Sequence, residues 1–183
     1  MMDDATRRLN PAYVVKLIEK INTSPFLRQN FMKVVDIGCD SSTVEAKIND
    51  VHLQALGMVH GGVYAALIDT AAYWAAFGGM EQKWGGLVSV DLKVNFLSSA
   101  SEGRLLATGR LIKMGKTLAY AEAKIETEDG KLVAHGTSTL LITSAKSDAG
   151  KDLPPKVLPA AAPGVRDEVV QPKSGLKPGG GPG

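Results

Sequence analysis

The chain has 183 residues and a mass of 19.3 kDa, which suits one domain with flanking segments and is too little for two enzymatic domains. Its 21 Lys and Arg against 19 Asp and Glu give a net charge of +2, so no strongly basic surface for nucleic acid is indicated. A single cysteine, Cys39, excludes an intrachain disulfide and fits a reducing compartment, which favours the cytoplasm. With only three histidines besides, the sequence shows no zinc-ligand spacing, and we expect no metal.

Residues 1–29 predict an N-terminal helical segment that packs on the rest of the chain. The N-terminus lacks the apolar stretch of a secretory signal. Asn10-Pro11 is typical of a helix cap followed by proline at the first helical position, and apolar residues recur at helical spacing over 10–22. Ser24-Pro25 should end this helix, because the residue before proline is disfavoured in the helical region.

Residues 30–143 predict a single α+β domain. Six segments have the composition and boundaries of strands: 32–38, 43–48, 87–97, 103–113, 116–127 and 131–142. Short turns join the last three, with Asp129-Gly130 marking a hairpin. An apolar helix from about residue 62 to 77 interrupts the strands, so we expect an antiparallel sheet wrapped around a central helix.

Residues 87–97 alternate regularly between apolar and polar side chains. The apolar residues predicted on one face are Val88, Val90, Leu92, Val94 and Phe96. Ser89 is thereby expected on the opposite, solvent-facing side, with Asp91 and Lys93. From residue 144 onward proline and glycine dominate without periodicity, so 144–183 is predicted to be a disordered tail.

Asp69 is the only charged residue between His60 and Met80. An unpaired carboxylate is very unfavourable in an apolar interior, so Asp69 needs partners or a functional role. The structural alternatives are a hydrogen-bond acceptor or a residue at a buried subunit contact. An aspartate in the middle of this stretch also argues against a membrane span and for a buried core helix.

His60-Gly61-Gly62 opens the same helix. A helix N-terminus presents unpaired N–H groups, and glycines let a substrate approach the backbone closely, as an oxyanion hole requires. Gly61 and Asp69 are eight residues apart, which is roughly 12 Å along a helix axis. The two can act on one substrate only if Gly61 lies in a loop that folds back, or if a second subunit is nearby.

The stretch HGGVYAALIDTAAYWAA resembles the central-helix motif of the hotdog-fold acyl-CoA thioesterases. The subgroup includes the phenylacetic-acid-degradation thioesterases and the mammalian thioesterase superfamily members. The resemblance continues through LVSVDLKVNFLSSA, GKTLAYAEAKI and DGKLVAHGTSTLLI, and it covers about residues 30–142.

The resemblance implies a role for each matching residue. Asp69 matches the catalytic acid, which acts as general base on water or as nucleophile on the thioester carbonyl. Gly61 matches the glycine whose N–H binds the thioester oxygen, with His60 supporting it. Gln54 matches an amide that contacts the acid or the attacking water, and Ser89 matches a hydroxyl supplied by the opposite subunit. Such sites lie at a dimer interface.

The sequence therefore predicts a cytoplasmic acyl-CoA thioesterase acting on a medium-to-long-chain or aryl acyl group, without a cofactor, as a homodimer or homotetramer. Gly62, at the helix start, and Lys116, a basic residue of the kind that relatives use at varying positions to bind coenzyme A phosphates, are expected to contact the substrate. Two alternatives stay open: a hotdog dehydratase or hydratase using His60 with Asp69, and a non-catalytic acyl-CoA-binding protein.

Overall fold

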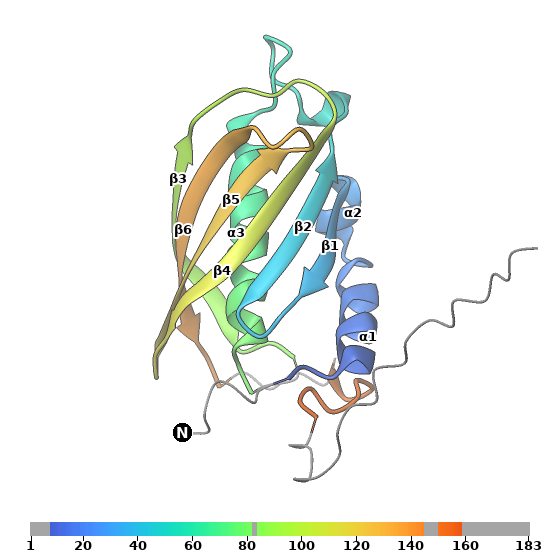
Figure 1. The fold of residues 1–183 in the computed structure, drawn as a ribbon, viewed down its shortest axis with the longest axis vertical. Helices are drawn as coiled ribbons and strands as arrows, with labels where there is room; N and C mark the ends of the chain where they lie inside the picture. Colours follow the sequence, from blue (N-terminus) through green and yellow to red (C-terminus); the bar gives the residue numbers. More distant parts are fainter. Residues whose placement is uncertain (1–7, 82–83, 145–149, 159–183) are drawn as a thin grey trace, which may run out of the picture.

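The computed structural model describes residues 8–81, 84–144 and 150–158, and six antiparallel strands in it wrap around one long helix (Figure 1). The strands are β1 (Met32–Ile37), β2 (Ser41–Lys47), β3 (Leu87–Phe96), β4 (Arg104–Met114), β5 (Leu118–Thr127) and β6 (Leu132–Ile142). They form one sheet in the order β1-β2-β4-β5-β6-β3, so β1 and β3 are its edges. The predicted antiparallel sheet around a helix is confirmed.

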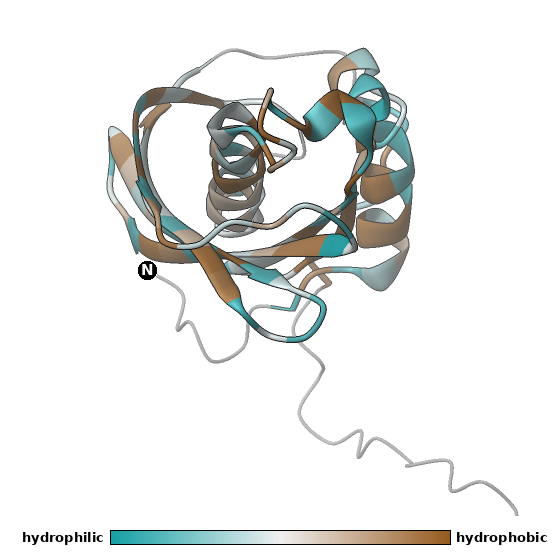
Figure 2. Cartoon of the chain, turned by 90° about the horizontal axis from the view of Figure 1, so that it is seen from above, coloured by the Kyte–Doolittle hydropathy of each residue, from teal (hydrophilic) through white to brown (hydrophobic). Residues whose placement is uncertain are grey.

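The central helix α3 (Gly61–Gly78) lies inside the curve of the sheet, as Figure 2 shows from above. Its apolar residues face the interior on nearly every side, and ten of its eighteen residues are buried. Two glycines allow the sheet to come this close. A Cβ on Gly109 would collide with the Ala71 carbonyl, and one on Gly136 would collide with the Lys93 carbonyl of β3 and with the Ile68 side chain of α3. The Ser42 hydroxyl also donates to the Ala71 carbonyl at 2.6 Å, which ties β2 to the helix.

A β-bulge between Ser89 and Asp91 corrects the predicted faces of β3. Ser89 pairs with Leu140 and Asp91 with Thr139, so Val90 is an extra residue in the strand. The bulge reverses the alternation, and Ser89 therefore points to the helix side of the sheet instead of the solvent side. The expected single apolar face from Val88 to Phe96 is wrong for the same reason, because periodicity alone does not reveal an inserted residue.

Two short helices, α1 (Pro11–Ile21) and α2 (Pro25–Gln29), lie beside β1 at the edge of the sheet (Figure 1). Asn10 caps α1 by accepting a hydrogen bond from the Ala12 N–H, and α1 buries one apolar face through Tyr13, Leu17 and Ile21. A 3-10 turn, η2 (Asp50–His52), leads toward the start of α3.

The prediction of a disordered tail from residue 144 is wrong for residues 150–158, while 159–183 lie outside the described residues. This segment joins the start of the chain through a bridge between Leu9 and Val157. Leu153 is buried in the core, and the buried Lys156 ammonium donates to the Phe77 carbonyl at 2.6 Å. Isolated anchors of this kind carry no periodic signal, so the sequence pattern could not indicate them.

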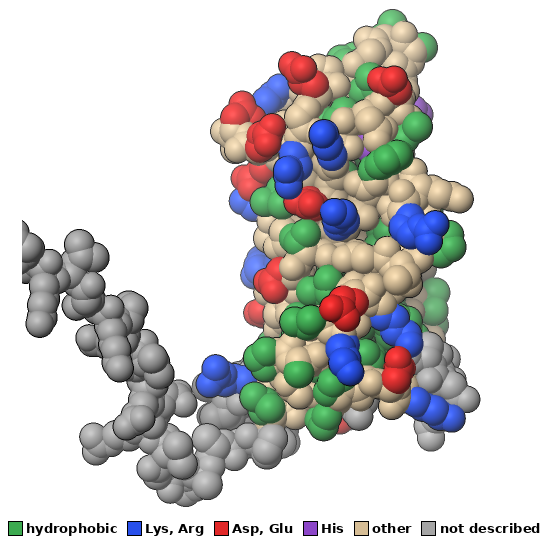
Figure 3. Space-filling model, turned by 90° about the vertical axis from the view of Figure 1, so that its right-hand side faces the viewer, with side chains coloured by type: hydrophobic (Ala, Val, Ile, Leu, Met, Phe, Trp, Pro, Cys, Tyr) green, Lys and Arg blue, Asp and Glu red, His purple; other side chains and the backbone are tan. Residues whose placement is uncertain are grey.

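Acidic and basic side chains are interspersed over the face shown in Figure 3, as the small net charge leads one to expect. Over the described ranges, the structure contains no helix long and apolar enough to cross a membrane.

Candidate active site

The Asp69 carboxylate lies half-buried on α3 and is held by a hydroxyl from the edge strand β3. The Ser89 Oγ donates to Asp69 Oδ1 at 2.7 Å, and the bulge in β3 makes this contact possible. Both residues belong to the same chain, which corrects the expectation that the opposite subunit supplies Ser89. One carboxylate oxygen is thus fixed by an O–H donor, and this contact leaves Oδ2 available to a substrate or a water.

Tyr73 lies one helical turn after Asp69 and shares its surroundings. Burial, and next the negative charge of Asp69, raise the pKa of Tyr73. Its hydroxyl therefore keeps its proton at neutral pH and stays a hydrogen-bond donor beside the carboxylate.

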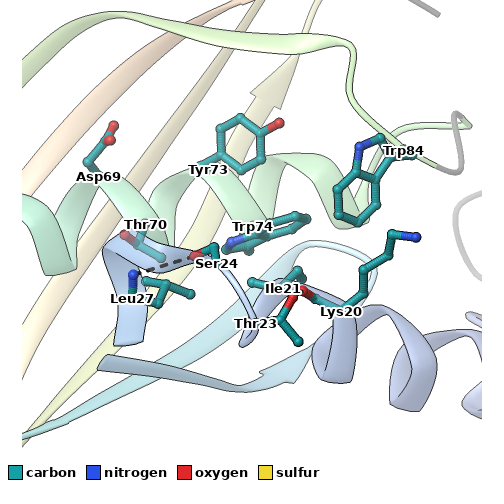
Figure 4. A pocket seen from close by; sticks show the side chains of 10 residues that line it. All are labelled: Lys20, Ile21, Thr23, Ser24, Leu27, Asp69, Thr70, Tyr73, Trp74 and Trp84. Atoms are coloured by element: carbon teal, nitrogen blue, oxygen red, sulfur yellow. Dashed lines mark hydrogen bonds between the residues drawn. The ribbon is translucent and has the colours of Figure 1, made fainter. Parts of the chain in front are cut away.

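A pocket of about 440 Å³ adjoins Asp69, between α3 and the junction of α1 with α2 (Figure 4). Its lining comes from three parts of the chain: Lys20, Ile21, Thr23, Ser24, Leu27, Asp69, Thr70, Tyr73, Trp74 and Trp84. Pockets of this size that are mostly apolar, with a few polar groups, are typical of small-molecule sites. Tyr73 and Trp74 line this pocket from α3. The sequence analysis did not single out Lys20 and Trp84, because their approach to each other depends on tertiary structure.

The start of α3 leaves one backbone donor unused. His60 is the N-cap, and its Nδ1 accepts the Gly62 N–H at 2.9 Å. The proton of the neutral imidazole therefore lies on Nε2. The Gly61 N–H has no hydrogen-bond partner among the described residues, whereas the Gly62 N–H is occupied by the cap. Of the two glycines, Gly61 is the one that offers a free donor to a ligand.

A second pocket, of about 380 Å³, opens beside Gly61. Gln54 lines it from a tight turn, in which its Oε1 accepts the Leu56 N–H at 2.6 Å. This bond leaves the amide NH₂ as the group that Gln54 can offer. The Phe96 ring lies over Gly61, where a Cβ would be 3.1 Å from the ring.

The predicted site residues thus form two clusters that one chain does not bring together. Gly61 is the first residue of α3, so it does not lie in a loop that could fold back. Eight helical residues separate Gly61 from Asp69 by roughly 12 Å of rise and turn them about 80° apart around the axis. Lys116 is exposed in the turn between β4 and β5 and lines neither pocket.

The other histidines have structural surroundings. His52 is buried, and its two ring nitrogens contact the Asn49 N–H and the Asn30 carbonyl. His135 lies 3.3 Å from a Glu122 carboxylate oxygen on the sheet. Within the part of the chain that the structure describes, no three His, Cys, Asp or Glu residues gather as metal ligands would.

Known proteins resemble this chain in sequence and in fold. A family model described as the thioesterase superfamily matches residues 56–134. Acyl-coenzyme A thioesterase 13 of the mouse is 34% identical over 97 residues, which cover 52% of this chain and 68% of the mouse protein. Zebrafish thioesterase superfamily member 2 has a TM-score of 0.62 at 26% identity and covers 70% of this chain and 94% of its own.

A mutant of the phenylacetic acid degradation protein of Thermus thermophilus has a TM-score of 0.60 at 24% identity, covering 66% of this chain and all of its own. At that identity it shows the shared fold alone. Together with the strand order, these likenesses confirm the α+β hotdog fold.

Proposed function

Because the chain belongs to the thioesterase superfamily and is therefore a thioester hydrolase, we propose that it hydrolyses acyl-CoA thioesters of medium-to-long-chain or aryl acids. The observation that carries the proposal is the Asp69 carboxylate, held by Ser89 at 2.7 Å and adjoining an apolar pocket. The apolar pocket suits the acyl group, and Asp69, which lines the same pocket, is the proposed reacting group.

In the proposed reaction, Asp69 acts as general base or as nucleophile. As base, Asp69 takes a proton from water, the hydroxide adds to the thioester carbonyl carbon, and the carbon–sulfur bond then breaks; the proton held by Asp69 passes to the leaving sulfur, so that the thiol and the free acid are released. As nucleophile, Asp69 attacks the carbonyl carbon, the carbon–sulfur bond breaks to release the thiol, and water then hydrolyses the acyl anhydride to the free acid and the Asp69 carboxylate. In both routes Ser89 fixes one carboxylate oxygen, which keeps the other directed at the reacting atoms.

The Gly61 N–H is the proposed donor to the carbonyl oxygen as negative charge develops there. Its position at the N-terminus of an 18-residue helix adds the favourable partial charge of the helix dipole. His60 supports this donor by occupying the neighbouring Gly62 N–H and fixing the helix start. Gln54, with its amide NH₂ free, is placed to contact the substrate or the attacking water beside Gly61.

Two chains are needed to complete this site, and we propose a homodimer, or a tetramer of such dimers, in which Gly61 of one chain faces Asp69 and Ser89 of another. The separation of Gly61 and Asp69 along α3 supports a site shared between two chains. Edge strand β3 offers an unpaired edge next to exposed Val88 and Val90, which are suited to a second copy. Light scattering should detect no fully active 19.3 kDa monomer.

The hydratase alternative needs a histidine that accepts a proton, and the geometry of His60 opposes it. The Nδ1 lone pair is used by the Gly62 N–H, so the exposed Nε2 carries a proton and donates. No cofactor is required for the hydrolysis proposed here. The cytoplasm remains the compartment that we propose, on the grounds of the single cysteine.

The decisive experiment measures thiol release from a panel of acyl-CoAs by the wild type and by Asp69→Asn. Asparagine is nearly isosteric but cannot act as base or nucleophile, so turnover should fall on the order of 10²–10⁴-fold while folding persists. Asp91→Asn is the matched control, because Asp91 is exposed on the same strand as Ser89. A folded Asp69→Asn variant with more than about a third of wild-type turnover would refute the mechanism.

A further inference from the structure

The pocket beside Asp69 extends well away from the carboxylate and has a defined far end. Figure 4 shows Asp69 and Thr70 at one end and Trp84 with Lys20 at the other, with Trp74 and Ile21 between them. Lys20 and Ile21 lie in α1, outside the residues that match the superfamily model. This chain therefore builds much of the pocket from its own N-terminal segment.

The walls of the pocket suit an acyl group without polar substituents. The Thr70 hydroxyl donates to the Ala66 carbonyl at 2.7 Å, and the Thr23 hydroxyl donates to the Lys20 carbonyl at 2.8 Å. The Ser24 oxygen accepts the Leu27 N–H as the cap of α2. Because these hydroxyls are engaged by the backbone, the remaining surface is dominated by aromatic and aliphatic side chains.

The far end is held by an ion pair and an aromatic contact. The Lys20 ammonium lies 3.2 Å from Asp152 Oδ1 and 5.6 Å from the centre of the Trp84 ring. Asp152 belongs to the segment 150–158 that packs against the start of the chain. Trp84 is half-buried and is followed by Gly85 and Gly86, both with positive φ, which turn the chain into β3.

We propose that Trp84, positioned by Lys20 and Asp152, is the end wall that limits the length of the acyl group. Within the medium-to-long-chain and aryl range proposed above, acyl groups of medium length or with one aromatic ring are then preferred over long chains, because long chains reach Trp84. This inference rests on the proposed thioesterase function and assigns the specificity of the same site.

The test compares kcat/KM for butanoyl-, octanoyl-, phenylacetyl- and hexadecanoyl-CoA, below their micelle concentrations, in the wild type and Trp84→Ala. The ratio of hexadecanoyl to octanoyl turnover should rise about tenfold or more in Trp84→Ala, since even one methylene in a tight pocket changes selectivity on the order of tenfold. Trp84→Phe should give an intermediate ratio. Phe26→Ala is the control, because Phe26 is an exposed aromatic residue of α2 that does not line the pocket.

Asp152→Asn supplies an independent reading, because it releases Lys20 without changing the pocket lining. It should shift the same ratio in the same direction by a smaller factor. A folded Trp84→Ala protein whose ratio stays within about twofold of the wild type refutes the end wall while leaving the thioesterase intact. Absence of thiol release by the wild type with every substrate refutes the proposed function, and this role of Trp84 with it.

Discussion

The beginning and the middle of α3 present two different kinds of chemistry. At the beginning, the group that can bind a ligand is the backbone N–H of Gly61, and the neighbouring His60 side chain caps the helix. In the middle, the useful group is a side-chain carboxylate at Asp69, and a bulged edge strand brings Ser89 to it. The helix keeps the two groups apart, so the reaction proposed above combines them across two copies of the chain.

Replacing Gly61 tests the backbone donor with the largest expected effect. Gly61→Pro removes the N–H, and the helix should tolerate it because proline suits the first helical position and His60 already has an extended backbone. Loss of one oxyanion donor should lower kcat about 10²–10³-fold.

Gly61→Ala is the matched control, because it adds a similar Cβ against Phe96 but keeps the N–H. Steady-state thiol release should rank the wild type first, Gly61→Ala second and Gly61→Pro far below both. Equal loss in the two variants would mean that crowding by Phe96, and not the missing donor, controls the rate.

A mixed dimer tests whether the two clusters come from different chains. Heterodimers of Asp69→Asn with Gly61→Pro, purified through two affinity tags, contain one site with both defects and one intact site if the site is shared. Activity should return to about half of the wild-type value, because a two-fold dimer has two sites. If one chain held the whole site, the heterodimer would be as inactive as the parent variants.

Ser89→Ala tests how far the edge strand supports the carboxylate. Loss of a hydrogen bond to a charged group costs on the order of 1.5–3 kcal/mol, so we expect kcat to fall roughly 10- to 150-fold, with KM nearly unchanged. Ser89→Thr keeps the hydroxyl and should recover much of the rate. An unchanged kcat in Ser89→Ala would show that Asp69 does not need the Ser89 hydroxyl to hold it in position.

Lys156→Met has the smallest expected effect on the reaction. It tests whether folding stability can fall while kcat is unchanged. It removes the buried hydrogen bond to the Phe77 carbonyl near the C-terminal end of α3. Without the ammonium, that buried carbonyl lacks its side-chain partner, so the free energy of unfolding should fall by about 2 kcal/mol and Tm by about 4–8 °C. Calorimetry measures the loss, and kcat at 25 °C should stay close to that of the wild type. A large fall in kcat would show that the far end of α3 is coupled to its catalytic part.

Much of the fold was predictable because it depends on periodic patterns. The alternation in the long strands and the uncharged stretch around Asp69 predicted the sheet and the central helix. The catalytic role of the carboxylate stays a prediction. The eight residues between Gly61 and Asp69 also raised the question of how the two could act on one substrate. Because Gly61 is the first residue of α3, the two groups of one chain stay far apart in the structure.

The errors came from features that involve one residue at a time. A single inserted residue at Val90 turned Ser89 to the helix, and the anchors Leu153 and Lys156 ordered a segment that composition marked as disordered. The pocket beyond Asp69 depends on α1 meeting Trp84, which are more than sixty positions apart in the chain. Local sequence patterns contain no information about tertiary contacts between such distant segments.

The two glycines that face α3 also limit how this protein can change over evolutionary time. Gly109 admits no methyl group while the Ala71 carbonyl of α3 stays where it is, and Gly136 admits none while the Lys93 carbonyl of β3 and the Ile68 side chain stay where they are. A smaller side chain on α3 does not make room at Gly109, because the obstacle there is helix backbone, and at Gly136 it leaves the Lys93 carbonyl in place. Descendants of this sequence can therefore leave glycine at these positions only after the backbone of α3 or of β3 has shifted.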